Sequence, residues 1–373
     1  MKKLICCIAI TASFMGSAWA QKTIAVSNPS DEYRLELISI PFAKFSKHFA
    51  VDTIFTVKDK SSGKIYLHQV EKLGQSSPQN ILIQVPITSK GKLDLIVTKE
   101  KAPSFPSKTY ARYIPERFDD YAWENDVAAF RLYGKALEGR PDDAQGMDYW
   151  AKRTENLVID KWYKINDYHK DHGEGLDYYS VGQTLGAGDL ALFHNNQIQF
   201  TKHYRRHEVL DNGPLRTTFK LTFDPQTIEG QEVSFSKTIR IDAGQNFNKI
   251  IVDFKNAHAK KTPLVVGLAK RDESKPEVEF DKEDKTLVYW EPNIKDFGRT
   301  GTAIILTNQK STYIDTNEKQ FLLKTEISNN KPFVYYNGGA WNKAGKITSF
   351  EEWEDAVENY AEQIRKPLIV KLK

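Results

Sequence analysis

The sequence predicts a mainly β protein: a large antiparallel β-sandwich with long loops and one helix near its C-terminus. Two observations support this prediction. Short runs of apolar residues, or of apolar residues alternating with polar ones, recur along the whole chain, whereas helical periodicity is rare. Many strands and few helices are typical of packed antiparallel sheets.

The expected strands are short and spread evenly over the chain. They cover residues 34–38, 52–57, 81–85, 93–97, 128–133, 198–204, 216–223, 235–241, 249–254, 263–268, 286–290, 301–306, 321–326 and 333–336. Residues 134–157 and 161–190 form long connections, and connections of this length in a compact domain are usually functional.

One helix is expected at residues 349–366. Ser349 followed by Glu352 has the spacing of a capping box, and Pro367 marks the end of the segment. Apolar residues recur between them at helical spacing, at Trp353, Val357, Tyr360 and Ile364. Residues 149–161 fit either a second helix or an irregular segment.

The first residues have the pattern of a secretory signal peptide. Two lysines precede an apolar run, and Ala18-Trp19-Ala20 supplies the small residues at the cleavage positions. Both cysteines of the chain lie within this leader, and no later apolar run is long enough to cross a bilayer. We therefore expect residues 1–20 to be removed, and residues 21–373 to form a single catalytic β-sandwich domain that is soluble and periplasmic.

The overall charge is close to balanced. The chain has 53 Lys and Arg residues against 49 Asp and Glu, a formal net charge of +4, and loss of Lys2 and Lys3 with the leader would lower it to +2. The two signs are interspersed along the chain, so nothing indicates a nucleic acid or a membrane as partner. A local basic pocket for an anionic ligand is still compatible with this balance.

The segment 167–179 is the most unusual in the chain. It holds two histidines, four carboxylates and three tyrosines within thirteen residues, and Gly182, Gly186 and Gly188 follow it. Such a segment is too polar for a core, and glycines let a backbone turn tightly and approach a ligand. We predict that it forms the edge of a functional site.

Three segments together resemble a known secreted family. They are Arg112-Tyr113-Ile114-Pro115-Glu116-Arg117-Phe118-Asp119-Asp120-Tyr121-Ala122-Trp123-Glu124-Asn125-Asp126, Asp160-Lys161-Trp162-Tyr163, and residues 167–179 with their His-Gly-Glu-Gly motif. The family is a domain of unknown function whose members sit in polysaccharide-utilisation loci of saccharolytic bacteria. The resemblance implies a role in oligosaccharide breakdown. It also implies a link to an oligosaccharide dehydratase that removes water from a terminal uronic acid of an ulvan-type algal polysaccharide.

A second resemblance concerns the fold. The segment Thr238-Ile239-Arg240-Ile241-Asp242-Ala243-Gly244 is similar to the long β-sandwich, or supersandwich, that galactose mutarotases share with several polysaccharide lyases. This resemblance implies a supersandwich of the galactose-mutarotase type.

Eliminating water or an alkoxide at C4 and C5 of a uronate needs three kinds of group. A cation or metal must offset the carboxylate, a base must take the C5 proton, and an acid must protonate the leaving oxygen. The candidate cation is Arg117, with Arg112 as an alternative. The candidate proton carriers are His169, His172, Tyr178 and Tyr179, and a tyrosine qualifies only if a neighbouring cation depresses its pKa.

Each arginine has an alternative interpretation. Arg112 and Arg117 are equally compatible with structural ion pairs to the acidic residues of their own loop. Trp123 alternates with Ala122 and fits the core of a strand better than a binding surface.

Further candidates bind the substrate. Glu124 and Asp126 would point to one face of a strand, and His203 and Arg205 would share a face of the next expected strand. Glu174 lies in the unusual segment, and Tyr336 and Trp341 flank an amide- and glycine-rich stretch suited to a sugar-binding wall. Packing in the core is the alternative for every aromatic residue among them.

A metal site is also compatible with the sequence. His169 and His172 are three residues apart, and Glu174 could add an oxygen ligand, so the protein would hold one divalent metal or no cofactor at all. Ordinary hydrogen-bonded loop histidines are the alternative, because the nearby glycines disfavour a regular helix.

Three functions remain open. The first is a carbon–oxygen lyase or dehydratase acting on uronate-containing oligosaccharides, and the second is a glycoside hydrolase with the carboxylate pair Glu124 and Glu174. The third is a non-catalytic glycan-binding protein. No phosphate-binding glycine loop and no nucleophile elbow occur in the sequence. The expected partner is an acidic oligosaccharide, and the sequence leaves the sugar and the oligomeric state open.

Overall fold

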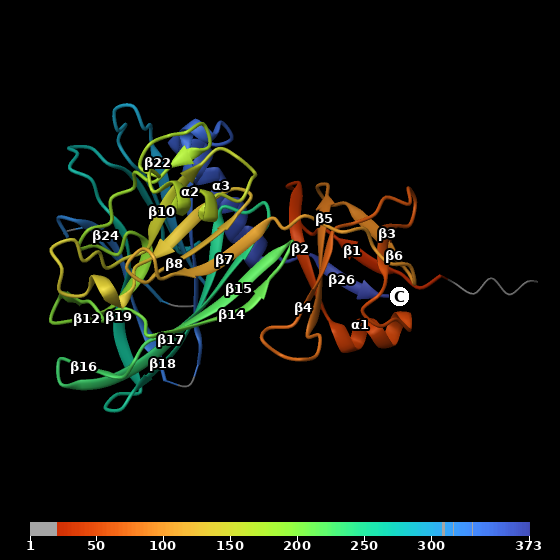
Figure 1. Ribbon diagram of the computed structural model, residues 1–373, viewed down its shortest axis with the longest axis horizontal. Coiled ribbons are helices and arrows are strands. Elements are labelled where there is room, and N and C mark those ends of the chain that lie inside the picture. Colours follow the sequence, from red (N-terminus) through yellow and green to blue (C-terminus); the bar gives the residue numbers. More distant parts are fainter. Residues whose placement is uncertain (1–20, 308–309, 316, 330) are drawn as a thin grey trace, which may run out of the picture.

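The computed structural model describes residues 21–307, 310–315, 317–329 and 331–373. The predicted signal peptide lies outside the described residues. Figure 1 shows two lobes side by side, a larger one and a smaller one that contains the N-terminal part of the described chain.

The smaller lobe, here called the N-terminal lobe, has two antiparallel sheets and one helix, α1 (Phe42–Phe49). The first sheet has the order β26 (Ile369–Leu372), β1 (Ile24–Ser27), β6 (Lys92–Thr98) and β3 (Thr56–Asp59). The second has the order β2 (Arg34–Pro41), β5 (Asn80–Ile87) and β4 (His68–Glu71). Because β26 pairs with β1, the C-terminal strand returns to this lobe.

The larger lobe contains three antiparallel sheets. The nine-stranded sheet has the order β14 (Arg206–Asn212), β15 (Arg216–Thr222), β17 (Gln231–Asp242), β18 (Phe247–Asn256), β25 (Phe333–Trp341), β22 (Thr300–Leu306), β21 (Thr286–Trp290) and β20 (Glu277–Asp281), and β16 (Gln226–Ile228) pairs with β17. A five-stranded sheet has the order β13 (Gln197–Gln199), β12 (Ala187–His194), β19 (Lys261–Ala269), β24 (Gln320–Ser328) and β23 (Thr312–Ile314). The other five-stranded sheet has the order β11 (Gly175–Leu176), β10 (Asp148–Lys152), β9 (Ala129–Leu132), β8 (Asp120–Asn125) and β7 (Thr109–Ile114).

The three sheets of the larger lobe share one apolar core. Alternate residues of the strands point into it. Among them are Ile239 and Ile250 of the nine-stranded sheet, here called the long sheet, Val266 of β19 and Phe130 of β9. The two helices of this lobe cover outer faces instead. Helix α3 (Phe350–Arg365) packs on the long sheet, and α2 (Ile159–Ile165) packs on the sheet that contains β8 and β10.

The mainly β antiparallel prediction is confirmed, as is the C-terminal helix. The Ser349 hydroxyl accepts a hydrogen bond from the Glu352 backbone N–H at 3.2 Å, as the capping pattern predicts. The segment 149–161 divides differently from either expectation, because it begins in strand β10 and ends in helix α2. Both parts pack an apolar face against a neighbouring layer, but side chains repeat at different intervals in a strand and in a helix. No single interval therefore describes the apolar residues of 149–161.

The described residues hold two separate main cores rather than one. Phe45, Val57 and Ile83 belong to the core of the N-terminal lobe. None of them belongs to the core that the three sheets of the larger lobe share. Hydrogen bonds join the lobes, including Gln84 Nε2 to the Ala243 carbonyl at 3.1 Å and Gln245 Nε2 to the Leu35 carbonyl at 2.8 Å. A single domain over residues 21–373 stays a prediction. In the described part of the chain no helix is long and apolar enough to cross a membrane.

Candidate functional site

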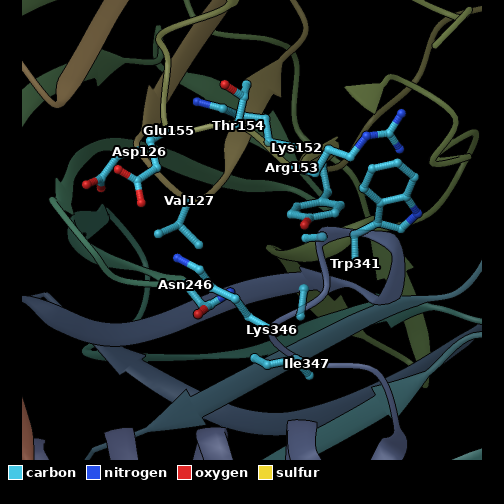
Figure 2. Close-up of a pocket in the computed structure, with 13 residues that line it drawn as sticks. Asp126, Val127, Lys152, Arg153, Thr154, Glu155, Asn246, Trp341, Lys346 and Ile347 are labelled. Carbon is cyan, nitrogen blue, oxygen red and sulfur yellow. The ribbon is translucent and has the colours of Figure 1, made fainter. Parts of the chain in front are cut away.

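A pocket of about 150 Å3 opens where several strands of the larger lobe end (Figure 2). Lys152 ends β10, Trp341 ends β25, Asp126 follows β8, and Asn246 lies in the turn between β17 and β18. Residues from four distant parts of the sequence therefore meet there. Its full lining is Asp126, Val127, Tyr149, Lys152, Arg153, Thr154, Glu155, Asn246, Ala340, Trp341, Ala344, Lys346 and Ile347.

The pocket combines an apolar floor with charged walls. Tyr149 and Trp341 are each 2% exposed and form part of the floor, while Arg153 and Lys346 supply positive charge. Figure 2 shows Arg153 beside Trp341 on one side of the pocket and the carboxylates of Asp126 and Glu155 on the opposite side. Such a mixture suits a sugar, because a pyranose has an apolar face and a rim of hydroxyl groups.

Arg153 is positioned by the unusual segment 167–179. Its Nη2 lies 2.5 Å from an Asp171 carboxylate oxygen, and its Nε donates to the Gly173 carbonyl at 3.2 Å. The guanidinium lies 5.2 Å above the Trp341 ring. Burial and these contacts act in opposite directions on Asp171, and the hydrogen bonds from Gly173 and Arg153 leave its pKa below the usual value. The predicted edge of a site thus holds a cation of this pocket.

The two carboxylates of the pocket differ in what they bind. Asp126 is 7% exposed, and its oxygens are occupied by Lys108 Nζ at 3.0 Å and by the Gly244 N–H at 2.6 Å. Glu155 is exposed and forms no ion pair with any residue in the described ranges. Glu155 is therefore the pocket carboxylate that is free to accept a proton.

Two of the predicted substrate-binding residues, Asp126 and Trp341, line this pocket, and none of the predicted catalytic residues does. Among the pocket residues that the sequence did not single out are Tyr149, Lys152, Arg153, Glu155, Asn246 and Lys346. One signal for them was present, since the cations Lys152 and Arg153 follow the aromatic pair Tyr149-Trp150 after one alanine and precede a polar run.

Glu124 and Trp123 serve the structure of the sheet. Both side chains are fully buried. Glu124 accepts hydrogen bonds from the Val158 and Ile159 backbone N–H groups at the start of α2, and from Lys152 Nζ at 2.8 Å. Trp123 donates to Asn248 Oδ1 at 2.8 Å. These contacts account for both residues as parts of the core.

The predicted arginines make contacts outside the pocket. Arg112 pairs with Glu116 at 2.7 Å and with Asp160 at 2.6 Å, which is the structural alternative considered for it. Arg117 donates from Nε to the Tyr168 hydroxyl at 2.9 Å. It therefore has a partner in the unusual segment and forms no ion pair with a described carboxylate of its own loop.

The predicted histidines bind the backbone of their own segment. His169 Nδ1 lies 2.8 Å from the Asp177 carbonyl oxygen, and His172 Nε2 lies 3.2 Å from the Asp167 carbonyl oxygen. Glu174 pairs with Lys161 at 2.6 Å. In the part of the chain that the structure describes, no three His, Cys, Asp or Glu side chains are grouped to hold a metal. The proposed ligand set His169, His172 and Glu174 is thus not assembled, because each member is engaged elsewhere.

Of the predicted tyrosines, Tyr179 is buried and Tyr178 is partly buried, and neither lines the pocket. The Tyr178 hydroxyl lies 2.5 Å from Thr300 Oγ1, and its ring centroid is 6.4 Å from that of Trp341. Arg271 lies 4.7 Å above the Tyr179 ring. Burial raises the pKa of both phenols, and for Tyr179 it outweighs the opposing effect of Arg271. The depressed pKa that proton transfer requires of them is not present.

His203 and Arg205 bind side chains of the long connection 134–157. His203 Nε2 lies 2.7 Å from Asp143, and Arg205 binds both oxygens of Glu138 at 2.8 Å. Both partners belong to the long connection 134–157. Tyr336 is buried on the outer face of the long sheet and lines a different cavity, described below.

A cluster of buried charges lies under α2 and the segment 167–179. Arg131 contacts Asp148 at 2.5 Å, Asp177 at 2.9 Å and Asp120 at 3.5 Å, and all four side chains are at most 5% exposed. Burial raises the pKa of Asp120 to about 6 even though Arg131 opposes it, and burial also raises the pKa values of Asp148 and Asp177. His169 contacts this cluster from outside through Asp177.

One family model and one curated relative match most of this chain. The family model described as "Domain of unknown function (DUF4861)" matches residues 26–370. The "Uncharacterized protein P7" of Formosa agariphila is 32% identical over 283 residues, which are 71% of this chain and 70% of that protein.

Two solved structures from Enterococcus faecalis are similar at 9% sequence identity. One is an alpha-mannosidase, with a TM-score of 0.46 over 94% of this chain and 46% of that chain. The other is a protein of glycosyl hydrolase family 38, with a TM-score of 0.48 over 94% of this chain and 47% of that chain. The chain spans about half the length of each.

Proposed function

Because this chain belongs to the DUF4861 family, whose description names no activity, we propose its function from the pocket: it binds the terminal uronate of an acidic oligosaccharide and eliminates water or an alkoxide at C4 and C5. The observation that carries this proposal is the opposition of Arg153 and Glu155 across an apolar floor (Figure 2). The protein would then be a carbon–oxygen lyase of oligosaccharide breakdown, secreted and acting without a nucleic acid or a membrane.

The proposed roles follow from the charges. Arg153 and Lys346 offset the uronate carboxylate, which makes the C5 hydrogen more acidic. A guanidinium held by Asp171 is also oriented in advance, so little reorganisation is needed when the substrate binds. Glu155 accepts the C5 proton, because it is the exposed carboxylate of the pocket and has no ion-pair partner among the described residues. The protonated Glu155 then donates this proton to the leaving oxygen, so that the C4–O bond breaks, the C4–C5 double bond forms and water or an alcohol departs.

The hydrolase alternative has less support. Glu124 would have to act on substrate, but it is fully buried and its oxygens bind α2 and Lys152. Its proposed partner Glu174 is engaged by Lys161. A purely binding function is compatible with the same pocket, and it differs from the proposal only in the absence of a product.

Product analysis on uronate-ended oligosaccharides separates these functions. We expect a product with the ultraviolet absorbance of a conjugated enol acid and, for dehydration, a mass lower by one water. Glu155→Gln should reduce kcat by about 100-fold or more, the usual range for loss of a proton acceptor. Arg153→Ala should reduce kcat/KM by roughly 100-fold.

The matched control is Lys170→Ala, which removes an exposed cation of the segment 167–179 that does not line the pocket. It should behave as the parent does. A product heavier by one water would favour hydrolysis, and stabilisation without any product would favour a binding protein. Full elimination by folded Glu155→Gln would disprove the assigned role of that residue.

A further inference from the structure

A second cavity, of about 300 Å3, lies on the outer face of the long sheet. Strands β17, β18 and β25 form its base, α3 contributes Tyr360 and Gln363, and β2 of the N-terminal lobe contributes Glu36 and Leu37. It is separate from the pocket at β10 and β25 and shares no lining residue with it. The cavity therefore stands where the two lobes and α3 meet.

The charges around this cavity are not all paired. Three cations line it, Arg216, Arg240 and Lys249. Arg216 is bound by both oxygens of Asp242, at 2.6 and 2.7 Å, and the other lining carboxylate, Glu36, pairs with Arg34 at 3.3 Å. Among the described residues, no carboxylate forms an ion pair with Arg240 or Lys249. The buried Nε of Arg240 also lacks a hydrogen-bond partner.

The strand register places two of these cations opposite each other, which destabilises the sheet at this point. Arg240 of β17 is directly opposite Lys249 of β18, and like charges at directly opposed positions of a sheet repel each other. Burial and the neighbouring guanidinium groups lower the pKa values of both side chains. Thr218, on the other side of Arg240 in the same row, has a buried hydroxyl without a partner. Arg240 Nε and the Thr218 hydroxyl thus lack partners beside two like charges, whereas the acceptor Glu36 Oε1, which also lacks a hydrogen bond, is ion-paired with Arg34 at 3.3 Å.

We propose that this cavity is a second binding site and that its ligand carries an oxyanion, namely a sulfate, phosphate or carboxylate group, which lies between Arg240 and Lys249. An oxyanion supplies the missing acceptor and reverses the repulsion between the two cations. Tyr336, whose ring centroid is 5.9 Å from Lys249 Nζ, and Tyr360 provide apolar surface for the body of a ligand. The site is independent of the function proposed for the first pocket.

Thermal unfolding of the full chain in inorganic sulfate, in D-glucuronate and in glucose, at constant ionic strength set with sodium chloride, tests this proposal. Sulfate or glucuronate should raise the Tm of the parent in a saturable way, because a ligand that binds only the folded state stabilises it by mass action. Glucose should not. The stronger of the two anions identifies whether sulfate-like or carboxylate groups are preferred.

The variants Lys249→Gln and Arg240→Gln should be at least as stable as the parent without anion and should not be stabilised by anion. Without anion, each should have a Tm equal to the parent's or higher by about 1 °C, because a like charge is removed. With sulfate, neither should gain stability. Arg153→Ala removes a cation of the first pocket and should keep the full response to sulfate, and exposed Lys92→Gln serves as a surface control.

Two results would overturn the proposal. One is a parent Tm that responds to sulfate and glucuronate no more than to sodium chloride or glucose. The other is an anion response that survives in both Lys249→Gln and Arg240→Gln. Loss of the response in Arg153→Ala alone would assign the anion to the first pocket and would equally overturn it.

Discussion

At the scale of single residues, Glu124 shows how burial changes the meaning of a carboxylate. In the sequence it is one of two acidic residues expected on one face of a strand and available to a substrate. In the structure its side chain is fully buried and its oxygens bind the first N–H groups of α2 and the ammonium of Lys152. A carboxylate at a helix N-terminus satisfies donors that the helix itself leaves unpaired.

Substituting Glu124→Gln should therefore reduce stability rather than chemistry alone. We expect a loss of about 3–5 kcal/mol in the free energy of unfolding, because Lys152 is left as a buried charge without its partner. Glu174→Gln is the matched control, since its pair with Lys161 is partly exposed and should contribute at most about 1 kcal/mol. Urea unfolding measures both. Equal stability of the two variants would contradict the structural role of Glu124.

At the scale of elements, the segment 167–179 joins the two charged regions of the larger lobe. One side of it holds Arg153 above Trp341 through Asp171, and the other side contacts the Arg131 cluster through Asp177. Strand β11 within it pairs with β10, so the segment is tied to the strand that Arg153 directly follows. Its position is thus set by the sheet rather than by its own sequence.

Asp171→Asn tests this positioning role on the proposed substrate. Without the ion pair, Arg153 is less well ordered above Trp341, and substrate binding should weaken more than the chemical step. We expect a roughly 3- to 5-fold rise in KM with kcat nearly unchanged, the scale of a partly exposed ion pair. Asp167→Asn is the control, because Asp167 contacts His172 and not Arg153. A large fall in kcat with unchanged KM would argue against positioning.

At the scale of the whole molecule, buried acids make stability depend on pH. Burial raises the pKa of Asp120 to about 6 and that of Glu291 to about 7, although Arg131 and Arg271 oppose the shifts. The ordinary values of 3.8 and 4.5 apply to the unfolded chain. Between these values the folded state binds more protons than the unfolded state. Stability from these groups is therefore fully present below the unfolded values and is lost as pH rises through about 6 and about 7.

The protein should thus resist urea better at about pH 5 than at about pH 8, by about 1 kcal/mol from Asp120 and about 2–3 kcal/mol from Glu291. The lowered pKa of Asp59, held at about 2 by hydrogen bonds from Ser61 and Ser62, acts only at more acidic pH. The Glu291→Gln variant should lose part of the pH dependence, as judged from urea midpoints at the two pH values. An unchanged slope in this variant would refute the contribution of Glu291.

Much of the fold could be predicted because its signals are local. Alternating apolar residues predicted the long strands β17 and β18. The capping-box spacing of Ser349 and Glu352 predicted the start of α3. Strand β10 was not predicted as a strand, and β8 was indicated only by Trp123 and Glu124 and not by the strand pattern. Both of their faces are buried, one in the core and one under α2, so their sequences do not alternate.

The candidate site could be predicted only in part. Residues 167–179 do not line the pocket but contact it through Asp171 and Arg153, and Trp341 and Asp126 do line it. Arg153 and Glu155 were not found, because a single cation or carboxylate after a strand has no sequence signature of its own. Their importance depends on which strand ends lie side by side.

The sequence by itself determined that this is a mainly β protein with a capped C-terminal helix and a polar segment unlike a core or a tail, since side-chain periodicity and capping act between residues close in the chain. Only the tertiary structure decided which charges have partners. It buried Glu124 and Arg131 among their counter-ions, left Glu155 free, and set Arg240 opposite Lys249. The physical reason is that pairing and desolvation depend on distances between strands that are far apart in sequence.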